Sequence, residues 1–400
     1  MLTTGGTIRR MRKAIGMTQA ELGTLIHFTQ PAVSQLEHDG PAVYDVRVLR
    51  RVARALQVPL ATLLTEPDDG ADMNRRQFFK TGAAGTAFLS GRRGNSDVAV
   101  SRGTQVGRAD IERITKSVNQ IHELQLIVGG DRLCDVAANE VYYVEQLLDL
   151  GSYTDTVGRS LTASAAGVMT AAGWVHYDAG RWNDARRYYA DAAQAATASG
   201  DSIAAAHAWI NACLLSFREG SRPKEGVQLA EAAQLAARRA GGPKLRALAA
   251  IREAEAHSVI GDRAATVAAV NRAHRAFDST GGQDPDYLVN MSEAQLSGLT
   301  GLTFMSLGEH RGAATYIRAA IDGAAAYPRE RTAWQIRLAQ NSIQAAEIAD
   351  GCDILSNHFE AMTKVASARL RAALSGIVDE LRLYSSVPEA ENFLGMWIAR

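Results

Sequence analysis

Residues 165–201 read "AAGVMTAAGWVHYDAGRWNDARRYYADAAQAATASGD", in which small and aromatic residues alternate at helical spacing. A small residue, a turn glycine, an aromatic residue, an alanine, a second aromatic residue and a second alanine follow in the order Gly173, Gly180, Trp182, Ala185, Tyr189 and Ala192. Small side chains let two antiparallel helices approach closely, aromatic rings fill the space between them, and glycine permits a sharp turn. The stretch therefore predicts a pair of packed helices joined at Gly180.

The same pattern returns along the carboxy-terminal part of the chain, where no strand pattern is evident. Turn glycines are expected at Gly180, Gly220, Gly261, Gly308 and Gly351, with spacings of 40, 41, 47 and 43 residues. The order of residue types resembles a tetratricopeptide repeat, although the spacings exceed the ~34 residues of that repeat. The resemblance implies a helical superhelix over residues 109–400, with one more helix pair in 109–160 and a terminal cap over 365–400.

A superhelix of this kind has a concave face that is formed by the first helix of each pair. Projecting the phase of the first unit onto the others places eight residues near this groove: Trp174, Tyr177, His207, Phe217, Arg218, Glu255, Gln295 and Asn341. Aromatic, amide and charged side chains suit an extended peptide, because its backbone needs donors and acceptors along its length. Each of these residues could instead be core packing or solvated helix surface.

The amino-terminal residues 7–64 divide into five short helical patterns. Thr18 followed by Glu21 is a capping box at the start of the second helix. Thr29 is a suitable N-cap for the third helix, and Pro31 lies in its first turn, where the missing N–H does no harm. We therefore expect a compact all-α head over residues 1–65.

Three stretches of this head resemble the Xre, or phage-repressor/Cro-like, helix-turn-helix family: "MTQAELG" (17–23), "TQPAVSQLEHDG" (29–40) and "LRRVARALQVPLATLL" (49–64). The resemblance implies that the third helix enters the major groove of double-stranded DNA. Carried over by position, the expected contacts to bases, groove wall and phosphates come from Gln19, Thr29, Gln30, Pro31, Ser34 and Gln35, with backbone charge from Arg12, Lys13 and Arg47.

The charge distribution agrees with a head that touches a polyanion. Residues 1–65 contain eight Lys/Arg and four Asp/Glu, whereas the chain after residue 93 carries a net charge of −5. The positive excess is modest, and Pro31 occupies a position where a side chain could read a base. We therefore expect a homodimer on a two-half-site operator. The whole layout resembles peptide-sensing regulators of Gram-positive bacteria, and more closely a large actinobacterial group.

Residues 66–108 are expected to be a linker, and they contain "NRRQFFK" (74–80), the core of a twin-arginine export signal. An export signal needs a free charged amino-terminal region and a small-residue cleavage site. This stretch follows a folded head and precedes no clear A-x-A motif, so a cytoplasmic protein is expected. Two alternatives stay open: a scaffold that does not bind DNA, and an exported binding protein that starts at Met73.

Several function classes lack a signal in the sequence. The three cysteines, Cys134, Cys213 and Cys352, show neither CxxC pairing nor zinc spacing, which favours a reducing compartment. No stretch reaches the roughly 18–20 apolar residues of a membrane span. None of the common nucleophile, phosphate-binding or metal motifs is present. We therefore expect no enzyme activity, no cofactor and no metal.

Overall fold

The computed structural model describes residues 3–14, 17–56, 63, 100–219, 222–325, 327–365 and 367–399. These residues are almost entirely helical, with a single pair of two-residue parallel strands, so the expected all-α fold is confirmed. The chain forms two compact units, Met1–Val106 with Asp131–Ser152, and Gly107–Gly130 with Tyr153–Arg400. We call the first the head unit and the second the ring unit.

The head unit begins with a helix-turn-helix arrangement. Its amino-terminal elements are α1 (Thr4–Ala14), α2 (Gln19–Ile26), α3 (Gln30–Glu37), the 3-10 helix η1 (Pro41–Tyr44) and α4 (Val46–Ala55). The expected capping box is present, because Thr18 Oγ1 accepts from Glu21 N at 3.2 Å and Thr18 N donates to Glu21 Oε2 at 2.6 Å. Thr29 caps α3, and His27, with φ 57°, provides the turn between α2 and α3.

The fifth helix that the sequence predicts, over residues 60–64, lies outside the described residues except for Leu63, which is buried. The core of the head comes from apolar residues on the inner faces of α1 to α4, all fully buried: Ile8, Leu22, Ile26, Val33, Leu36, Val48, Leu49 and Val52. The helical periodicity of this segment therefore identifies most of the core, but Leu25, which it also places on the apolar side of α2, is 55% exposed.

The head unit also contains a helix from the middle of the chain, α7 (Cys134–Leu150), with the strand pair β1 (Thr104–Gln105) and β2 (Gly151–Ser152). The guanidinium of Arg47 lies 3.6 Å above the ring of Tyr143, and Arg47 Nε is 3.9 Å from Glu140 Oε2. Asn139 Nδ2 donates to the carbonyl of Tyr44 at 3.3 Å. The compact units thus differ from the expected division at residues 108 and 109, because 131–152 cluster with the head.

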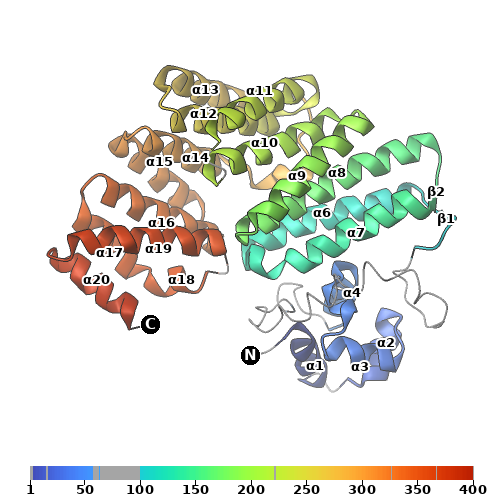
Figure 1. Ribbon diagram of the computed structural model, residues 1–400. Helices are drawn as coiled ribbons and strands as arrows, with labels where there is room; N and C mark the ends of the chain where they lie inside the picture. The colour runs from blue at the N-terminus through green and yellow to red at the C-terminus, as the bar shows by residue number, and fades with distance from the viewer. Residues whose placement is uncertain are drawn as a thin grey trace. The chain divides into compact units, whose positions relative to one another are not determined.

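The ring unit is built from consecutive helix pairs that pack on one another (Figure 1). After α6 (Arg108–Val128), the pairs are α8 (Asp155–Asp178) with α9 (Trp182–Ser199), α10 (Ser202–Arg218) with α11 (Pro223–Ala240), α12 (Pro243–Val259) with α13 (Arg263–Phe277), α14 (Glu293–Ser306) with α15 (His310–Gly323), and α16 (Pro328–Gln344) with α17 (Ile348–Asn357). A short η5 (Asp286–Asn290) precedes α14, and the 3-10 helix η4 (Gly130–Arg132) lies where the chain passes between the units.

The turns inside the pairs follow the expected rule at three of its five positions. Gly180, Gly261 and Gly308 have φ of 71°, 78° and 74°, the left-handed region that glycine adopts without strain. Gly220 lies outside the described residues. The prediction for Gly351 is wrong, because this residue lies inside α17; the left-handed turn position of the last pair is taken by Ala346, with φ 62°.

Gly173 and Tyr189 show why the first repeat unit alternates small and aromatic residues. The ring of Tyr189 packs directly against Gly173, so that a Cβ added to the glycine would collide with it. Tyr189, Ala185 and Ala192 are fully buried between α8 and α9. The packing predicted for Gly173, Ala185, Tyr189 and Ala192 is therefore observed. Trp182 is an exception, because it lies at the start of α9, is 44% exposed and does not fill the space between the helices.

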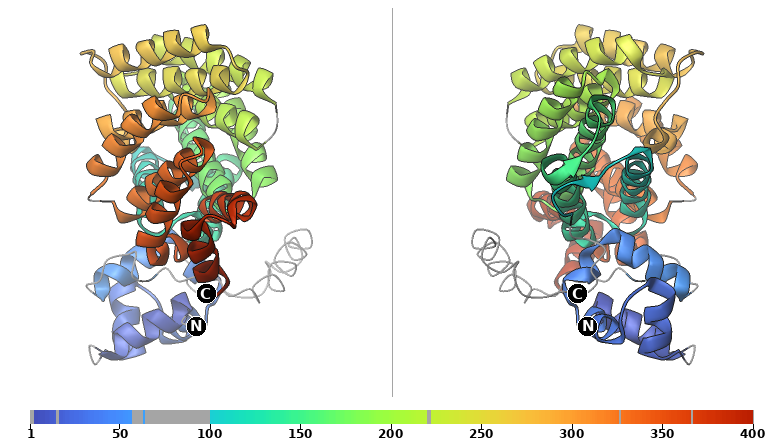
Figure 2. Two further views of the ribbon diagram at one scale, coloured as in Figure 1. Left: turned by 90° about the vertical axis from the view of Figure 1, so that its left-hand side faces the viewer. Right: turned by 90° about the vertical axis from the view of Figure 1, so that its right-hand side faces the viewer.

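The series of pairs bends until its end meets its beginning (Figures 1 and 2). The last elements are α18 (Phe359–Thr363), α19 (Ala368–Leu381), η6 (Arg382–Tyr384) and α20 (Pro388–Ile398), and the last three lie in the region 365–400 expected to cap the array. Helix α19 contacts α8, and α16 contacts α6, so residues near both ends of this unit touch.

Candidate functional sites

Helix α3 presents a row of short polar side chains to solvent. Thr29, Gln30, Pro31 and Gln35 are exposed, and Ser34 is half-buried. Val33 and Leu36 on the opposite side are fully buried and attach the helix to the core. The predicted contact face is thus a single accessible face, offering amide and hydroxyl groups that can donate and accept hydrogen bonds.

The glutamine at the start of this face is held by the preceding helix. Gln30 Nε2 donates to Gln19 Oε1 at 2.8 Å, and Gln19 Nε2 donates to Glu37 Oε2 at 2.8 Å. Gln19 therefore connects the exposed Gln30 amide to a buried carboxylate. This orients the Gln30 side chain before any partner arrives, which lowers the entropy cost of a contact.

Two of the three predicted backbone-charge residues have a different position from the one expected. Arg12 is buried and makes a bidentate ion pair with Glu37, and its Nη1 also donates to the carbonyl of Met17 at 2.5 Å. Arg47 donates to Asp45 through Nε at 3.0 Å and Nη2 at 2.8 Å. Because carboxylates inside the unit already occupy these guanidiniums, both arginines stabilise the head.

The charge available to a polyanion comes from neighbouring positions. Lys13, the third predicted residue, is exposed, as are Arg9, Arg10 and Arg54.

Burial raises the pKa of Glu37, but the hydrogen bonds from Arg12 and Gln19 outweigh it and keep this pKa below its usual range. The ion pair with Arg12 is therefore charged at neutral pH.

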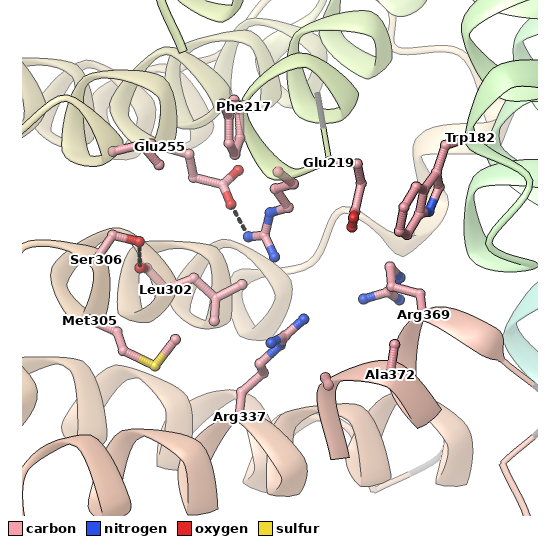
Figure 3. A pocket seen from close by; sticks show the side chains of 13 residues that line it. Trp182, Phe217, Glu219, Glu255, Leu302, Met305, Ser306, Arg337, Arg369 and Ala372 are labelled. Carbon is pink, nitrogen blue, oxygen red and sulfur yellow. Dashed lines mark hydrogen bonds and ion pairs between the residues drawn. The ribbon is translucent and has the colours of Figure 1, made fainter. Parts of the chain in front are cut away.

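The ring unit contains a cavity of about 360 Å³ on its inner side (Figure 3). Its charged lining residues are Arg218, Glu219, Glu255, Arg337 and Arg369. Its other lining residues are Trp182, Phe217, Val259, Leu302, Met305, Ser306, Ala372 and Ala373. They come from α9, α10, α12, α14, α16 and α19, so five of the six helices are first helices of pairs or the closing helix.

A smaller cavity of about 60 Å³ shares Arg218, Leu302, Arg337 and Arg369 with the larger one. Six of the eight residues predicted for the groove line one or both cavities: Trp174, Tyr177, Phe217, Arg218, Glu255 and Gln295. We call the two adjoining cavities the arginine pocket. The phase projected from the first repeat unit therefore points six side chains to the same space.

The other two predicted groove residues lie elsewhere. His207 is buried and stacks on Tyr287, with 4.2 Å between the ring centroids, and burial lowers its pKa well below the usual range. Asn341 is 1% exposed, and its Nδ2 donates to the carbonyl of His310 at 3.0 Å. Its Oδ1 lies 3.1 Å from the ring nitrogen Nδ1 of His310. Neither residue lines the arginine pocket, because each contacts a neighbouring helix or loop.

Two buried carboxylates hold four of the arginines around the pocket. Glu255 binds Arg218 at 2.5 Å and also pairs with Arg252. Asp178 accepts from Arg329 at 2.5 Å, from Arg369 at 3.1 Å, from Ser367 Oγ at 2.9 Å and from the backbone N–H of Gly130 at 2.9 Å. Burial raises the pKa of Asp178, but these partners outweigh it and lower that pKa to about 2.

Arg337 differs from the other arginines of the pocket. Among the described residues, no ion pair joins it to a carboxylate, and its Nη1 donates to Gln340 Oε1 at 2.8 Å. Burial, together with the charges of Arg218 and Arg369, lowers the pKa of Arg337 to about 9. The pocket therefore has an excess of positive charge centred on Arg337.

Sequence reasoning missed Arg337 and Arg369. Arg337 precedes the predicted Asn341 by one helical turn on α16 and lies on the same side of that helix, so a prediction made one turn earlier along α16 would have found it. Arg369 belongs to the region expected only to cap the array, and no repeat signal points to its contact with Asp178.

Among the described residues, no group of three His, Cys, Asp or Glu side chains could hold a metal ion, and no helix is long and apolar enough to cross a membrane.

Comparison with known proteins finds a similarity in the amino-terminal part of the chain. A helix-turn-helix family matches residues 8–63, which include most of α1 and all of α2 to α4. No curated protein matches the chain. Among the solved structures that match is PlcR of Bacillus thuringiensis in complex with the peptide PapR7 and DNA, at 17% identity, with 70% of this chain and 95% of that chain covered and a TM-score of 0.30.

Proposed function

We propose that this protein is a sequence-specific DNA-binding transcriptional regulator whose ring unit binds a peptide or protein segment and which acts as a homodimer. One observation carries the proposal: the exposed face of α3, with Gln30 oriented by Gln19, lies inside the segment that matches a helix-turn-helix family. A glutamine amide presents a donor and an acceptor together, which matches the N7 and N6 edge of adenine in the major groove.

The electrostatics of the head support a phosphate-rich partner. Arg9, Arg10, Lys13 and Arg54 are exposed, and Gln19 stands at the first position of α2, where the helix dipole favours an anion. These four exposed cations, counted among the described residues of the head, give only a modest affinity per head, since phosphate contacts dominate the binding energy. Two heads on a two-half-site operator double these contacts, which is the reason for proposing a homodimer.

The base-contact role can be tested with Gln35→Ala once DNA bound by the full chain has been recovered from the genome. We expect the variant to lose about 1–3 kcal/mol of binding free energy on that DNA and little on random DNA at the same salt concentration. Gln283→Ala, which removes an exposed glutamine from the ring unit, is the matched control. An equal loss on both DNAs would leave Gln35 with a positioning role alone.

The arginine pocket supports the sensing part of the proposal. Aromatic and aliphatic walls with a few converging polar groups are typical of ligand sites, and about 360 Å³ lies at the small end of their size range. A ligand changes DNA occupancy only if it binds one state of the protein better than another, and a coupling of about 1–3 kcal/mol would suffice. The test is the salt-matched DNA affinity of the full chain with and without a bound peptide.

A further inference from the structure

Three guanidinium groups from three separate helices meet in the arginine pocket. Arg218 comes from the last turn of α10, Arg337 from the middle of α16 and Arg369 from the start of α19. Figure 3 shows the side chains of Arg337 and Arg369 pointing into the cavity, with the carboxylate of Glu255 on the facing wall. Like charges that lie this close repel one another, so the arrangement requires compensating negative charge.

The chain itself supplies less negative charge than the cluster contains. We define the arginine cluster as the five residues Arg218, Arg252, Arg329, Arg337 and Arg369. The carboxylates that contact this cluster or line its pocket are four: Asp178, Glu219, Glu255 and Glu330. One unit of positive charge therefore has no counterpart within the described cluster. Among these described residues, Arg337 is the member that forms no ion pair with a carboxylate, and the carboxylate whose charge acts on it from nearby is the pocket-lining Glu219.

The scaffold around Arg337 is fixed by neighbouring ion pairs. Glu255 is paired with Arg218, and Asp178 is paired with Arg369. Neither carboxylate can turn toward Arg337 without the loss of a buried ion pair. Arg337 is half-buried on α16 between the buried residues Ile336 and Leu338. The pocket thus presents an oriented, incompletely neutralised guanidinium at a fixed place.

We propose that the arginine pocket binds the carboxylate of a peptide through Arg337, with Arg218 and Arg369 beside it. The inference rests on the proposed function, in which the ring unit binds a peptide, and names the group that it recognises. A carboxylate carries a single negative charge and matches the planar fork of a guanidinium with two parallel hydrogen bonds. It balances the single excess charge, whereas a phosphate group with nearly two charges would exceed it.

The remaining walls define what lies next to that carboxylate. Trp182, Phe217, Val259, Leu302 and Met305 form apolar and aromatic surfaces around the charged groups. Trp182 and Val259 are each 44% exposed, so these surfaces are accessible in the ring unit as it stands. An apolar side chain beside the carboxylate would bury these surfaces, which favours a hydrophobic residue at the adjacent position of the peptide.

The experiment uses the full chain and four probes at millimolar concentration. The first probe, N-acetyl-leucyl-phenylalanine, has a free terminal carboxylate, and the second, N-acetyl-leucyl-phenylalanine amide, has no carboxylate. The third, N-acetyl-aspartyl-phenylalanine amide, carries its carboxylate on a side chain, and the fourth is inorganic phosphate. Calorimetry and tryptophan fluorescence report binding. We expect at least one carboxylate peptide to bind about tenfold or more tightly than the amide, as hydrogen bonds to charged groups predict. Comparing the two carboxylate peptides tells a terminal carboxylate from an acidic side chain.

The decisive variant is Arg337→Gln, with Arg331→Gln, an exposed arginine of the same helix, as the control. Arg337→Gln should abolish the difference between acid and amide while leaving Tm of the free protein equal or higher, because it removes an unneutralised charge. Arg331→Gln should retain the difference. Arg337→Lys, which keeps the charge but loses the fork, should give an intermediate ratio and serves if the glutamine variant does not fold.

The failures of the two proposals are distinguishable. If acid and amide peptides bind equally to the parent, the ring unit still binds peptides, and the carboxylate inference is wrong. If phosphate binds and no peptide does, both the inference and the peptide-sensing role are wrong. If no probe binds, Arg337 is not a carboxylate site for peptides of this class, and the inference is overturned as well.

Discussion

The head unit and the ring unit each contain a buried carboxylate that holds arginine, but the two carboxylates work over very different distances along the chain. Glu37 binds Arg12, 25 residues away, and Gln19 lies between them in sequence. Asp178 binds Arg329 and Arg369, which are 151 and 191 residues away. The first ion pair fixes three neighbouring short helices, whereas the second joins α8 to α16 and α19.

This difference shows how each unit reaches a unique shape. In the head, local caps and a small core specify the fold, and the ion pair adds to an arrangement that neighbouring residues already favour. In the ring, each helix pair packs mainly on the next, and stacking alone leaves the curvature free to vary. Asp178 ties the first pair to the last elements, so that the ring closes and Arg369 is held at the pocket.

The strongest way to break this contrast is to remove the charge of the long-range carboxylate. Asp178→Asn leaves Arg369 without its carboxylate and leaves Arg329 with Glu330 alone. Removing one partner of a buried ion pair typically costs about 3–5 kcal/mol of unfolding free energy. Urea denaturation of the full chain should show this loss in the transition of the ring unit. The control is Asp184→Asn, which removes a carboxylate from an exposed ion pair with Arg187 at 3.7 Å and should have a small effect.

If Asp178→Asn and Asp184→Asn lower the stability equally, the closing contact contributes nothing special and the ring is held by stacking alone. A stable Asp178→Asn variant that nevertheless loses the protection of α19 amides from hydrogen exchange would show that the ring opens without unfolding. Either result would correct the view that one carboxylate defines the curvature.

Acid provides the second test, through the depressed pKa of Asp178. The folded-state pKa is about 2, whereas the ordinary value is 3.8. A carboxyl group with a lowered pKa stabilises the folded state above its ordinary pKa, and this contribution is lost as the pH falls from 3.8 toward 2. A depression of this size corresponds to about 2 kcal/mol.

The measurement is the free energy of unfolding at about pH 5 and at about pH 2.5 in the parent and in Asp178→Asn, which separates Asp178 from the other carboxylates. The variant should lose less stability than the parent over this range. A ¹³C titration of the Asp178 carboxyl group with a midpoint near its ordinary pKa would contradict the proposed ion-pair network.

The local ion pair of the head is expected to matter less. Arg12→Gln leaves Glu37 with Gln19 as a partner, so we expect a loss of about 1.5–3 kcal/mol, the size of a hydrogen bond to a charged group. Hydrogen exchange of the α1 and α3 amides in the full chain measures it. Lys13→Gln, an exposed basic residue on the same helix, is the control, and an equal effect of both variants would show that Arg12 acts through charge alone.

The contrast between the units also explains what the sequence could predict. Thr18, Glu21 and Thr29 mark the starts of α2 and α3 through contacts between residues at most three positions apart. A family pattern covers the same segment, so the head could be predicted closely. The arginine pocket depends on the contact between Arg369 and Asp178, which are 191 residues apart in sequence. A repeat period of about 40 residues gives no indication that these two residues meet. His207 and Asn341 were misplaced for a related reason, because repeats of unequal length shift the phase of each first helix.

The smallest expected effect tests the repeat rule itself, at two glycines inside helices. Gly376 lies within α19 with no atom within 4 Å of an added Cβ, so Gly376→Ala should stabilise the protein by roughly 0.5–1 kcal/mol through helix propensity. Gly351 lies within α17, where an added Cβ would stand 2.6 Å from Ile343 Cγ1 and 3.2 Å from the carbonyl of Ala339.

Gly351→Ala should therefore destabilise by about 1 kcal/mol, because α16 and α17 would have to separate to admit the methyl group. The two variants make the same chemical change in helices of the same unit, so propensity is common to both and only the packing differs. Measured by thermal denaturation, Tm should be higher than in the parent for Gly376→Ala and lower for Gly351→Ala. If both variants raise Tm, Gly351 is not a close-contact residue, and the last pair is packed more loosely than the pairs before it.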